Sequence, residues 1–420
     1  MQPLPRALGA RTRRTLIGAA LASAVALAAT ACSSGATAAG TGSGSGPLTI
    51  GISLSLSGDF SDSGKAAQRG YQLWMDDVNQ QGGVLGRKIQ LKIVDDASNP
   101  TQVVSNYTNL INQDHVDLVF GPFSSLLTVP ASRVASRYDY AFIEPAGGGP
   151  SVFAQKLHNL FFVQPAPTTS GGLVFANYIL SLPAAERPKT AAYVKLDDPF
   201  SAPIADLVKA KLEAAGIKTV YDKTYEAETA DMTPIIAGVA AANPDVIVGG
   251  SQEADAFAQI KAMIQLHVNP KFLFEANGPN SPADFPPAVG TANTEDVFSS
   301  IDWYPGSTQA GSAAFIHSYL KKYGGTENQI DPTSAEAYSA GMLVDEVAKK
   351  TGKVDNQTII DTLHSGAWPT LVGDLSWDAS GAPQGEYKLV QWMGGKIQTV
   401  FPATGAQHAP VAPKRPWSGQ

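Results

Sequence analysis

Residues 48–54 read Leu-Thr-Ile-Gly-Ile-Ser-Leu, in which every second residue is a large apolar one. Strict alternation of this kind predicts a β-strand with one buried face. The next hundred residues repeat helix and strand patterns: helices at 66–81, 100–113 and 127–138, and strands at 88–94, 116–120 and 141–143. A β-α-β-α-β-α-β order predicts a parallel sheet with helices on both faces.

The same order returns after residue 190. Strands are expected at 191–194, 219–225, 246–249 and 272–274, separated by helices at 204–215, 233–242 and 254–266. Beyond about residue 298 the pattern is mostly helical, at 313–322, 335–350 and 357–364, and it ends in strands at 388–392 and 396–400. Those late helices have no sheet of their own. We expect them to cover the first lobe, while the last strands complete the second.

These patterns predict an α/β protein with two doubly wound parallel-sheet lobes joined by crossover hinges. Lobe 1 takes residues 47–165 and 299–370, and lobe 2 takes residues 166–298 and 371–402. Residues 164–170 are rich in Pro and suit a crossover, and residues 403–420 are expected to form an extended C-terminal tail.

The first 46 residues have the composition of an export and anchoring segment. Residues 16–29 are uncharged, small and apolar, and they follow four arginines. That run is too short for a comfortable membrane span and is typical of a secretory signal peptide. Small residues then lead to Cys32, which resembles the lipidated cysteine of a bacterial lipobox. Ser, Gly, Ala and Thr dominate residues 33–46, which we expect to form a flexible tether.

We therefore expect residues 1–31 to be removed and the protein to be exported and lipid-anchored to the outer face of the bacterial cytoplasmic membrane. A plain signal peptide, cleaved near Ala31, is the alternative. The pair Arg13-Arg14 leaves both Sec and twin-arginine export open.

The composition excludes several classes of protein. With 44% hydrophobic and 16% charged residues, the chain can bury sizeable cores. Its 37 acidic residues outnumber 30 basic ones, so we expect no nucleic-acid partner. A single cysteine cannot build an internal disulfide framework or a Cys-based zinc site. The six histidines lack ligand-like spacing, so no metal and no cofactor are expected.

Several short stretches, taken in order, resemble the type I periplasmic solute-binding proteins, in the branch that contains the leucine/isoleucine/valine-binding protein of ABC importers. The matching residues are Leu56-Ser-Gly58, 77–87, Asp95-Asp96, Pro100, 121–125, 145–149, Ala337-Tyr338, Gly373 and Trp377-Asp378. The resemblance spans about residues 47–400. It implies two lobes that close on a small ligand, with no covalent chemistry.

Three first-lobe loops are expected to meet at the carboxyl ends of the strands, where ligands bind in open α/β sheets. Ser124 and Ser125 supply hydroxyl groups, and 146–149 is a glycine-rich turn before Pro150, which is well suited to begin a helix. Amide groups at a helix start attract anions. Together with the resemblance, this indicates a carboxylate held by Ser125, Ala146 and Gly148, with Ser124 and Gly147 beside them. The alternative is an ordinary glycine turn with a serine cap.

In the second lobe the strand-end candidates are Phe200, Ser251 and Asn277. The resemblance implies that Phe200 packs on the ligand, although it also suits an ordinary core aromatic residue. Relatives that bind amino acids place an acid near Asn277, and Ser63 replaces an aromatic wall of the first lobe. A neutral Asn277 favours hydroxyl or amide groups over an ammonium, unless Glu275, Glu253 or Asp255 points into the cleft and restores the acid.

The sequence thus predicts a monomeric receptor that delivers a small polar ligand, such as a branched-chain or other amino acid, an amide or a related carboxylate, to the membrane subunits of an ABC importer. One rival is a ligand-sensing module of a membrane signalling partner. The other is a two-lobed exported enzyme, but no nucleophile with a base, G-x-S-x-G elbow or metal pattern is found.

Overall fold

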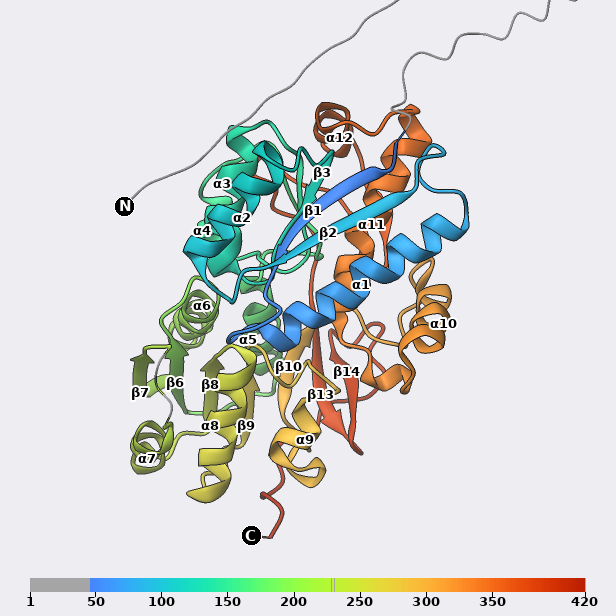
Figure 1. Ribbon diagram of the computed structural model, residues 1–420. Coiled ribbons are helices and arrows are strands. Elements are labelled where there is room, and N and C mark those ends of the chain that lie inside the picture. Colours follow the sequence, from blue (N-terminus) through green and yellow to red (C-terminus); the bar gives the residue numbers. More distant parts are fainter. Residues whose placement is uncertain (1–45, 228, 230, 420) are drawn as a thin grey trace, which may run out of the picture. The chain divides into compact units, whose positions relative to one another are not determined.

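The first of the two large sheets is entirely parallel and contains five strands (Figure 1). The computed structural model describes residues 46–227, 229 and 231–419, which belong to one compact unit. The strand order is β2-β1-β3-β4-β5. The strands span β1 Leu48–Leu54, β2 Ile89–Asp95, β3 Leu118–Phe120, β4 Phe142–Glu144 and β5 Leu160–Phe162. The carboxyl ends of all five strands therefore lie at one edge, as a doubly wound sheet requires.

Helices cover both faces of this sheet. They are α1 Ser61–Gln80, α2 Pro100–Asn112, α3 Ser125–Arg137 and the short α4 Pro150–Phe153. Asn99 caps α2 by accepting hydrogen bonds from Thr101 N and Gln102 N at 2.8 and 3.1 Å, directly before Pro100 at the first helical position. Pro150 likewise begins α4, as expected from the sequence.

The second sheet has seven strands in the order β14-β13-β10-β9-β8-β6-β7. Its strands span β6 Thr190–Leu196, β7 Lys218–Tyr225, β8 Val246–Gly250, β9 Phe272–Glu275, β10 Phe298–Ile301, β13 Lys388–Met393 and β14 Lys396–Phe401. Strands β6 to β10 pair in parallel, whereas β13 joins β10, and β14 joins β13, in antiparallel fashion. The last two strands complete the second lobe, as expected.

The helices of the second lobe are α5 Thr169–Ser181, α6 Ser201–Ala214, α7 Thr233–Ala242, α8 Glu253–Gln265 and α9 Phe285–Val289, followed by η1 Thr291–Asn293. Helix α5 packs on α6, β10 and β13. No helix was predicted at α5, whose first residues lie in the Pro-rich stretch 164–170 that was expected to form a crossover. The structure explains Gly172: a Cβ there would lie 2.7 Å from Ile204 Cγ2 of α6, so the two helices approach too closely for a side chain.

Three late helices return to the first lobe, as expected: α10 Ser312–Tyr323, α11 Pro332–Thr351 and α12 Asn356–Leu363, with η2 Glu327–Gln329 between the first two (Figure 1). Helices α1 and α11 lie side by side. A Cβ on Gly341 would lie 2.0 Å from the Trp74 ring. The glycine therefore lets the indole fill the space between the helices.

The chain crosses between the lobes three times, after β5, after β10 and after Trp377. Leu371, Val372, Leu375 and Trp377, with the hairpin β11 Trp368–Thr370 and β12 Gly373–Leu375, pack in the first-lobe core. The third crossing thus comes later than the expected boundary near 371. Likewise β10 belongs to the second sheet, so the second crossing follows Ile301 rather than residue 298.

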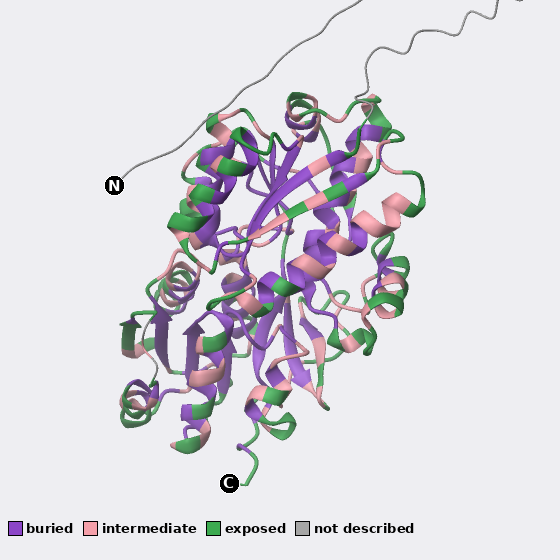
Figure 2. Cartoon of the chain, viewed as in Figure 1, coloured by how far each residue is buried: buried purple, intermediate pink, exposed green. Residues whose placement is uncertain are grey.

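Buried residues concentrate along both sheets and on the helix faces turned toward them (Figure 2). The C-terminal residues 403–419 also contribute. They contain no helix or strand, but Trp417 is only 2% exposed and packs in the second-lobe core. Residues 403–419 are therefore docked on the second lobe along part of their length.

Candidate functional site

A cleft with a cavity volume of about 70 Å³, partly open to solvent, is lined by residues of both lobes. First-lobe residues come from α1, from the loops after β3, β4 and β5, and from the start of α11. Second-lobe residues come mainly from α6 and the loops after β8, β9 and β10. These loops follow the carboxyl ends of the strands, where the topology places a ligand site. Five of the residues singled out from the sequence line this cleft: Ser63, Ser124, Ala146, Phe200 and Asn277.

Ser124 occupies the turn between β3 and α3. Its backbone has φ 77°, a value that few residues other than glycine adopt, and its amide donates to Ala146 O at 3.0 Å. The side chain is 3% exposed, and its hydroxyl has no hydrogen-bond partner. A buried hydroxyl on a cleft wall without a partner is suited to bind a ligand atom, because leaving it unpaired is costly.

The glycine-rich turn 146–149 has partners within the chain. Ala146 N donates to Glu144 Oε2 at 3.1 Å, and Gly149 N donates to Ser125 Oγ at 2.9 Å. Burial raises the pKa of Glu144 to about 8, while the amides of Ala146 and Gly147 act in the opposite direction. Glu144 therefore accepts hydrogen bonds from amide groups that were predicted to bind a ligand carboxylate.

Gly147 and Gly148 lie behind the cleft wall rather than on it. A Cβ on Gly147 would lie 2.1 Å from Thr128 Oγ1, and one on Gly148 would lie 2.1 Å from the Phe162 ring. Gly148 O accepts hydrogen bonds from both the amide and the hydroxyl of Thr168, at 3.0 and 2.9 Å. These glycines allow close packing, and Ser125 and its neighbours support the wall that carries Ser124 and Ala146.

In the second lobe, Asn277 faces the cleft and Glu275 does not. Asn277 is 8% exposed and lines the cleft, and its Oδ1 accepts from Gly278 N at 2.9 Å. Glu275 is fully buried behind the wall, where its Oε2 accepts from Ser251 Oγ at 2.7 Å. Burial raises the pKa of Glu275 to about 8. Ser251 thus serves Glu275 and does not line the cleft.

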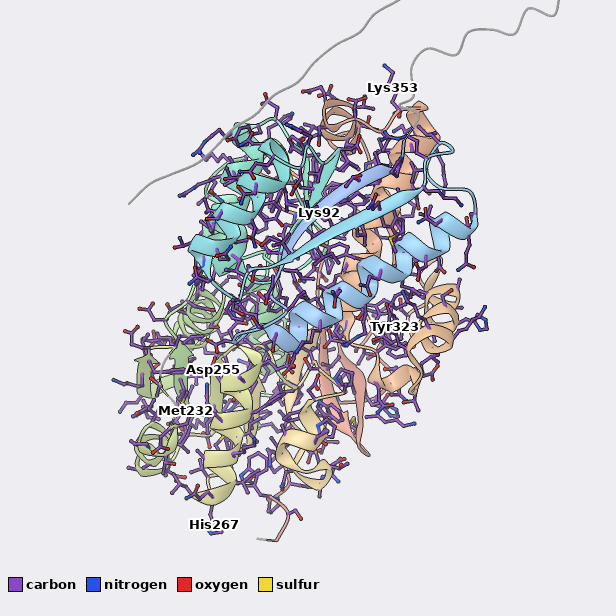
Figure 3. The ribbon with its side chains drawn as sticks, viewed as in Figure 1. Lys92, Met232, Asp255, His267, Tyr323 and Lys353 are labelled. Atoms are coloured by element: carbon purple, nitrogen blue, oxygen red, sulfur yellow. The ribbon has the colours of Figure 1, made fainter. Side chains whose placement is uncertain are left out.

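Glu253 and Asp255, the other acids considered from the sequence, begin α8. Glu253 Oε2 accepts from Ser63 Oγ of the first lobe at 3.2 Å and from Ser281 Oγ at 3.1 Å. It lines an adjoining hollow that shares Ser63, Phe123, Gln252 and Asn277 with the cleft. Asp255 lines neither space, and Figure 3 places it at the end of α8 nearer the first lobe.

Three acidic residues that sequence patterns did not indicate also line the cleft: Asp302, Asp331 and Glu336, here called the acid cluster. Asp302 follows β10, Asp331 caps α11, and Glu336 lies within α11. Each resembles a surface acid in the sequence, and only the fold brings the three to one cleft. The resemblance offered no signal for them.

Other chemistry is sparse among the described residues. Over residues 46–227, 229 and 231–419, no group of three or more His, Cys, Asp or Glu side chains is placed to hold a metal ion. In the same part of the chain no helix is long and apolar enough to span a membrane. Cys32, the expected lipidation site, lies outside the described residues.

Known proteins are similar to this chain in sequence and in fold. A profile of the periplasmic binding protein family matches residues 47–396. The Leu/Ile/Val-binding protein homolog 1 of Brucella melitensis biotype 1 is 27% identical over 343 residues, covering 79% of this chain and 86% of the relative. The Leu/Ile/Val-binding protein homolog 7 of Brucella abortus is 24% identical over 368 residues, covering 83% of this chain and 90% of the relative.

Solved structures agree on the fold. LivJ of Streptococcus pneumoniae, a branched-chain amino acid transporter substrate binding protein in complex with isoleucine, superposes with a TM-score of 0.73 at 20% identity, covering 88% of this chain and 99% of LivJ. An ABC transporter solute binding protein of R. palustris, in complex with benzoate, gives 0.72 at 20% identity, covering 89% and 98%. The profile match over most of the chain shows that this chain belongs to the periplasmic binding protein family, and the solved structures share its two-lobed α/β fold.

Proposed function

We propose that the chain is an extracytoplasmic solute-binding receptor of an ABC importer, which captures one small polar ligand between its two lobes. The observation that carries this proposal is the cleft itself, lined by polar side chains of both lobes and containing the unpartnered hydroxyl of Ser124. The names of the relatives favour a branched-chain or other amino acid, and an amide or a related carboxylate is the wider class.

Within this proposal, Ser63, Ser124, Ala146, Phe200 and Asn277 contact the ligand because they line the cleft. Ser125, Gly147, Gly148 and Ser251 support those contacts, because their polar groups or close packing hold the loops in place. Binding is therefore divided between the lobes, and a ligand that touches both favours the closed arrangement.

The contact between Ser63 and Glu253 is suited to report closure. Ser63 belongs to α1 and Glu253 to α8, so their 3.2 Å hydrogen bond joins the lobes in the hollow that adjoins the cleft. Opening the cleft would break this bond and expose the carboxyl group to water. We propose that ligand binding stabilises this contact together with the closed form.

For delivery to the importer, we propose that Cys32 carries the lipid that holds the receptor at the outer face of the cytoplasmic membrane. Residues 33–46 would serve as the tether. The receptor acts as a monomer in this scheme and meets the importer's membrane subunits in the ligand-bound form.

A thermal-shift panel of amino acids, amides and small carboxylates tests the receptor function. A solute at a hundred times its Kd should stabilise the protein by about 2.7 kcal/mol. The matched control is Ala146→Trp, which fills the cleft from its half-buried wall position and should abolish the shift. If no solute of any class raises the melting temperature of the wild type, the receptor proposal fails.

A further inference from the structure

The acid cluster gives one part of the cleft an unusual charge. Asp331 and Glu336 are each 5% exposed, and Asp302 is half-buried. No Lys, Arg or His is among the residues that line the cleft or its adjoining hollow. Three carboxyl groups thus face a common space that contains no basic partner of its own, although buried acids are normally paired.

Two acids of the cluster are bonded to each other and not to a basic group. Asp331 Oδ1 accepts from Thr333 N at 2.8 Å and caps α11, which is an ordinary structural role. Asp302 Oδ1 accepts from Trp303 N at 2.7 Å. In contrast, no other donor reaches the buried Asp302 Oδ2 and Glu336 Oε2, and the two side chains hydrogen-bond to each other, which requires a proton on one of the two carboxyl groups. A cationic ligand could supply donors in place of that proton.

A separate observation points to a ligand site in the same space. The Ser124 hydroxyl, on the first-lobe wall, is also buried without a partner. The remaining walls include the rings of Phe123, Phe200 and Phe274. Aromatic rings and carboxylates both favour a cationic nitrogen, through cation–π attraction and charge-assisted hydrogen bonds respectively.

We propose that Asp302 and Glu336 bind the protonated nitrogen of a small organic cation, either an amine or the ammonium group of an amino acid. This inference rests on the proposed receptor function and names the chemical class of its ligand. It moves the acid that holds the nitrogen from the strand end near Asn277 to the crossing after β10 and to α11. A metal ion is a poorer occupant, because none of the described acids is grouped to hold one.

Proton release should accompany binding. Burial raises the pKa of both Asp302 and Glu336, and for Glu336 the charge of Asp302 raises it further. Without ligand the pair therefore retains a proton near neutral pH. The ligand nitrogen enters already protonated and keeps its protons, so the O–H bond of the carboxyl group breaks and that proton passes to solvent. Affinity for the cation should rise as the pH increases through the titration of the pair.

Other groups act on this titration. Asp331 raises the pKa of both Asp302 and Glu336, and Gln164 lowers that of Glu336. Burial raises the pKa values of Asp331 and Asp284, and the charge of Arg69 in α1 partly opposes this rise. Burial raises the pKa of Tyr387, and the charges of Asp302, Glu336 and Glu144 raise it further. Burial raises the pKa of Glu253, which lines the adjoining hollow, and the charges of Asp331 and Asp284 raise it further.

The test compares three ligands that carry the same branched side chain, and adds one linear diamine. Leucine carries both head groups, 3-methylbutylamine lacks the carboxylate, and 4-methylpentanoate lacks the amine; putrescine adds a second, linear amine. We expect at least one amine-bearing probe to raise the melting temperature, and we expect 4-methylpentanoate to have no effect. Calorimetry of the bound probe in buffers of different ionisation enthalpy should detect proton release.

Glu336→Gln and Asp302→Asn should each weaken the amine-bearing probe by about tenfold or more. The matched control is Glu327→Gln, the same change at an exposed position, which should leave affinity unchanged. Two separate variants guard against misfolding of either one.

Binding of 4-methylpentanoate but of no amine, unchanged affinity in both variants, or binding without proton release would each overturn the inference and leave the receptor function standing. A complete absence of binding by solutes of any class would overturn both.

Discussion

The docked C-terminus makes Trp417→Ala a demanding test of the fold. Trp417 is 2% exposed, donates from Nε1 to Val268 O at 2.7 Å, and lies under Lys414 Nζ, which is 3.3 Å from the ring centroid. Truncating a buried Trp costs about 3–5 kcal/mol at core sites. Residues near a chain end can detach from the core, which limits the loss, so we expect about 3 kcal/mol.

For a lobe of this size, that loss corresponds to a fall in melting temperature of roughly 6–12 °C. Differential scanning calorimetry measures the shift, and hydrogen exchange at residues 403–419 should show that this segment loses protection first. Ser418→Ala, at an exposed neighbouring position, is the control and should lie within 1 °C of the wild type. If Trp417→Ala behaves like this control, the segment is not docked as described.

Three further outcomes are expected. Ser124→Ala should weaken the bound solute by about tenfold to a hundredfold in calorimetry, since it removes a buried donor worth about 1–3 kcal/mol, and unchanged affinity would remove Ser124 from the site. The folded-state pKa of about 8 for Glu144, Glu253 and Glu275 means that the native state binds more protons than the unfolded state, so stability should fall as pH rises from about 5 to 8; a flat profile in that window would contradict the assignment. Cys32→Ala should move the exported protein from the membrane fraction to the soluble one, and retention at the membrane would count against lipidation.

Much of the fold could be predicted because each buried sheet leaves a simple pattern. The alternation at 48–54 marks β1, and its residues pair with β2 from Leu48–Ile89 to Leu54–Asp95. Strands were not predicted where their buried residues are polar or small. Strand β10 reads Phe-Ser-Ser-Ile, yet Ser299 is fully buried because its hydroxyl donates to Glu275 O at 2.8 Å. An internal hydrogen bond of this kind cannot be read from one strand alone.

The candidate site was predictable where topology alone decides position. Ser124, Ala146, Phe200 and Asn277 follow strand ends and line the cleft. The partners of neighbouring groups were not predictable, because Glu144 and Ser125 take amides that looked available to a ligand.

The acid cluster could not be predicted from the sequence for a different reason. Asp302 and Glu336 come from separate elements and meet only after the chain has crossed between the lobes, so no local spacing links them.

Native mass spectrometry of the protein, isolated after export and without dialysis, tests the central claim most directly. We expect the wild type to carry one noncovalent small solute, in one-to-one ratio, and we expect Ala146→Trp to carry none because its side chain fills the cleft. The bare mass alone in the wild type, or the same adduct on both proteins, would contradict binding in this cleft.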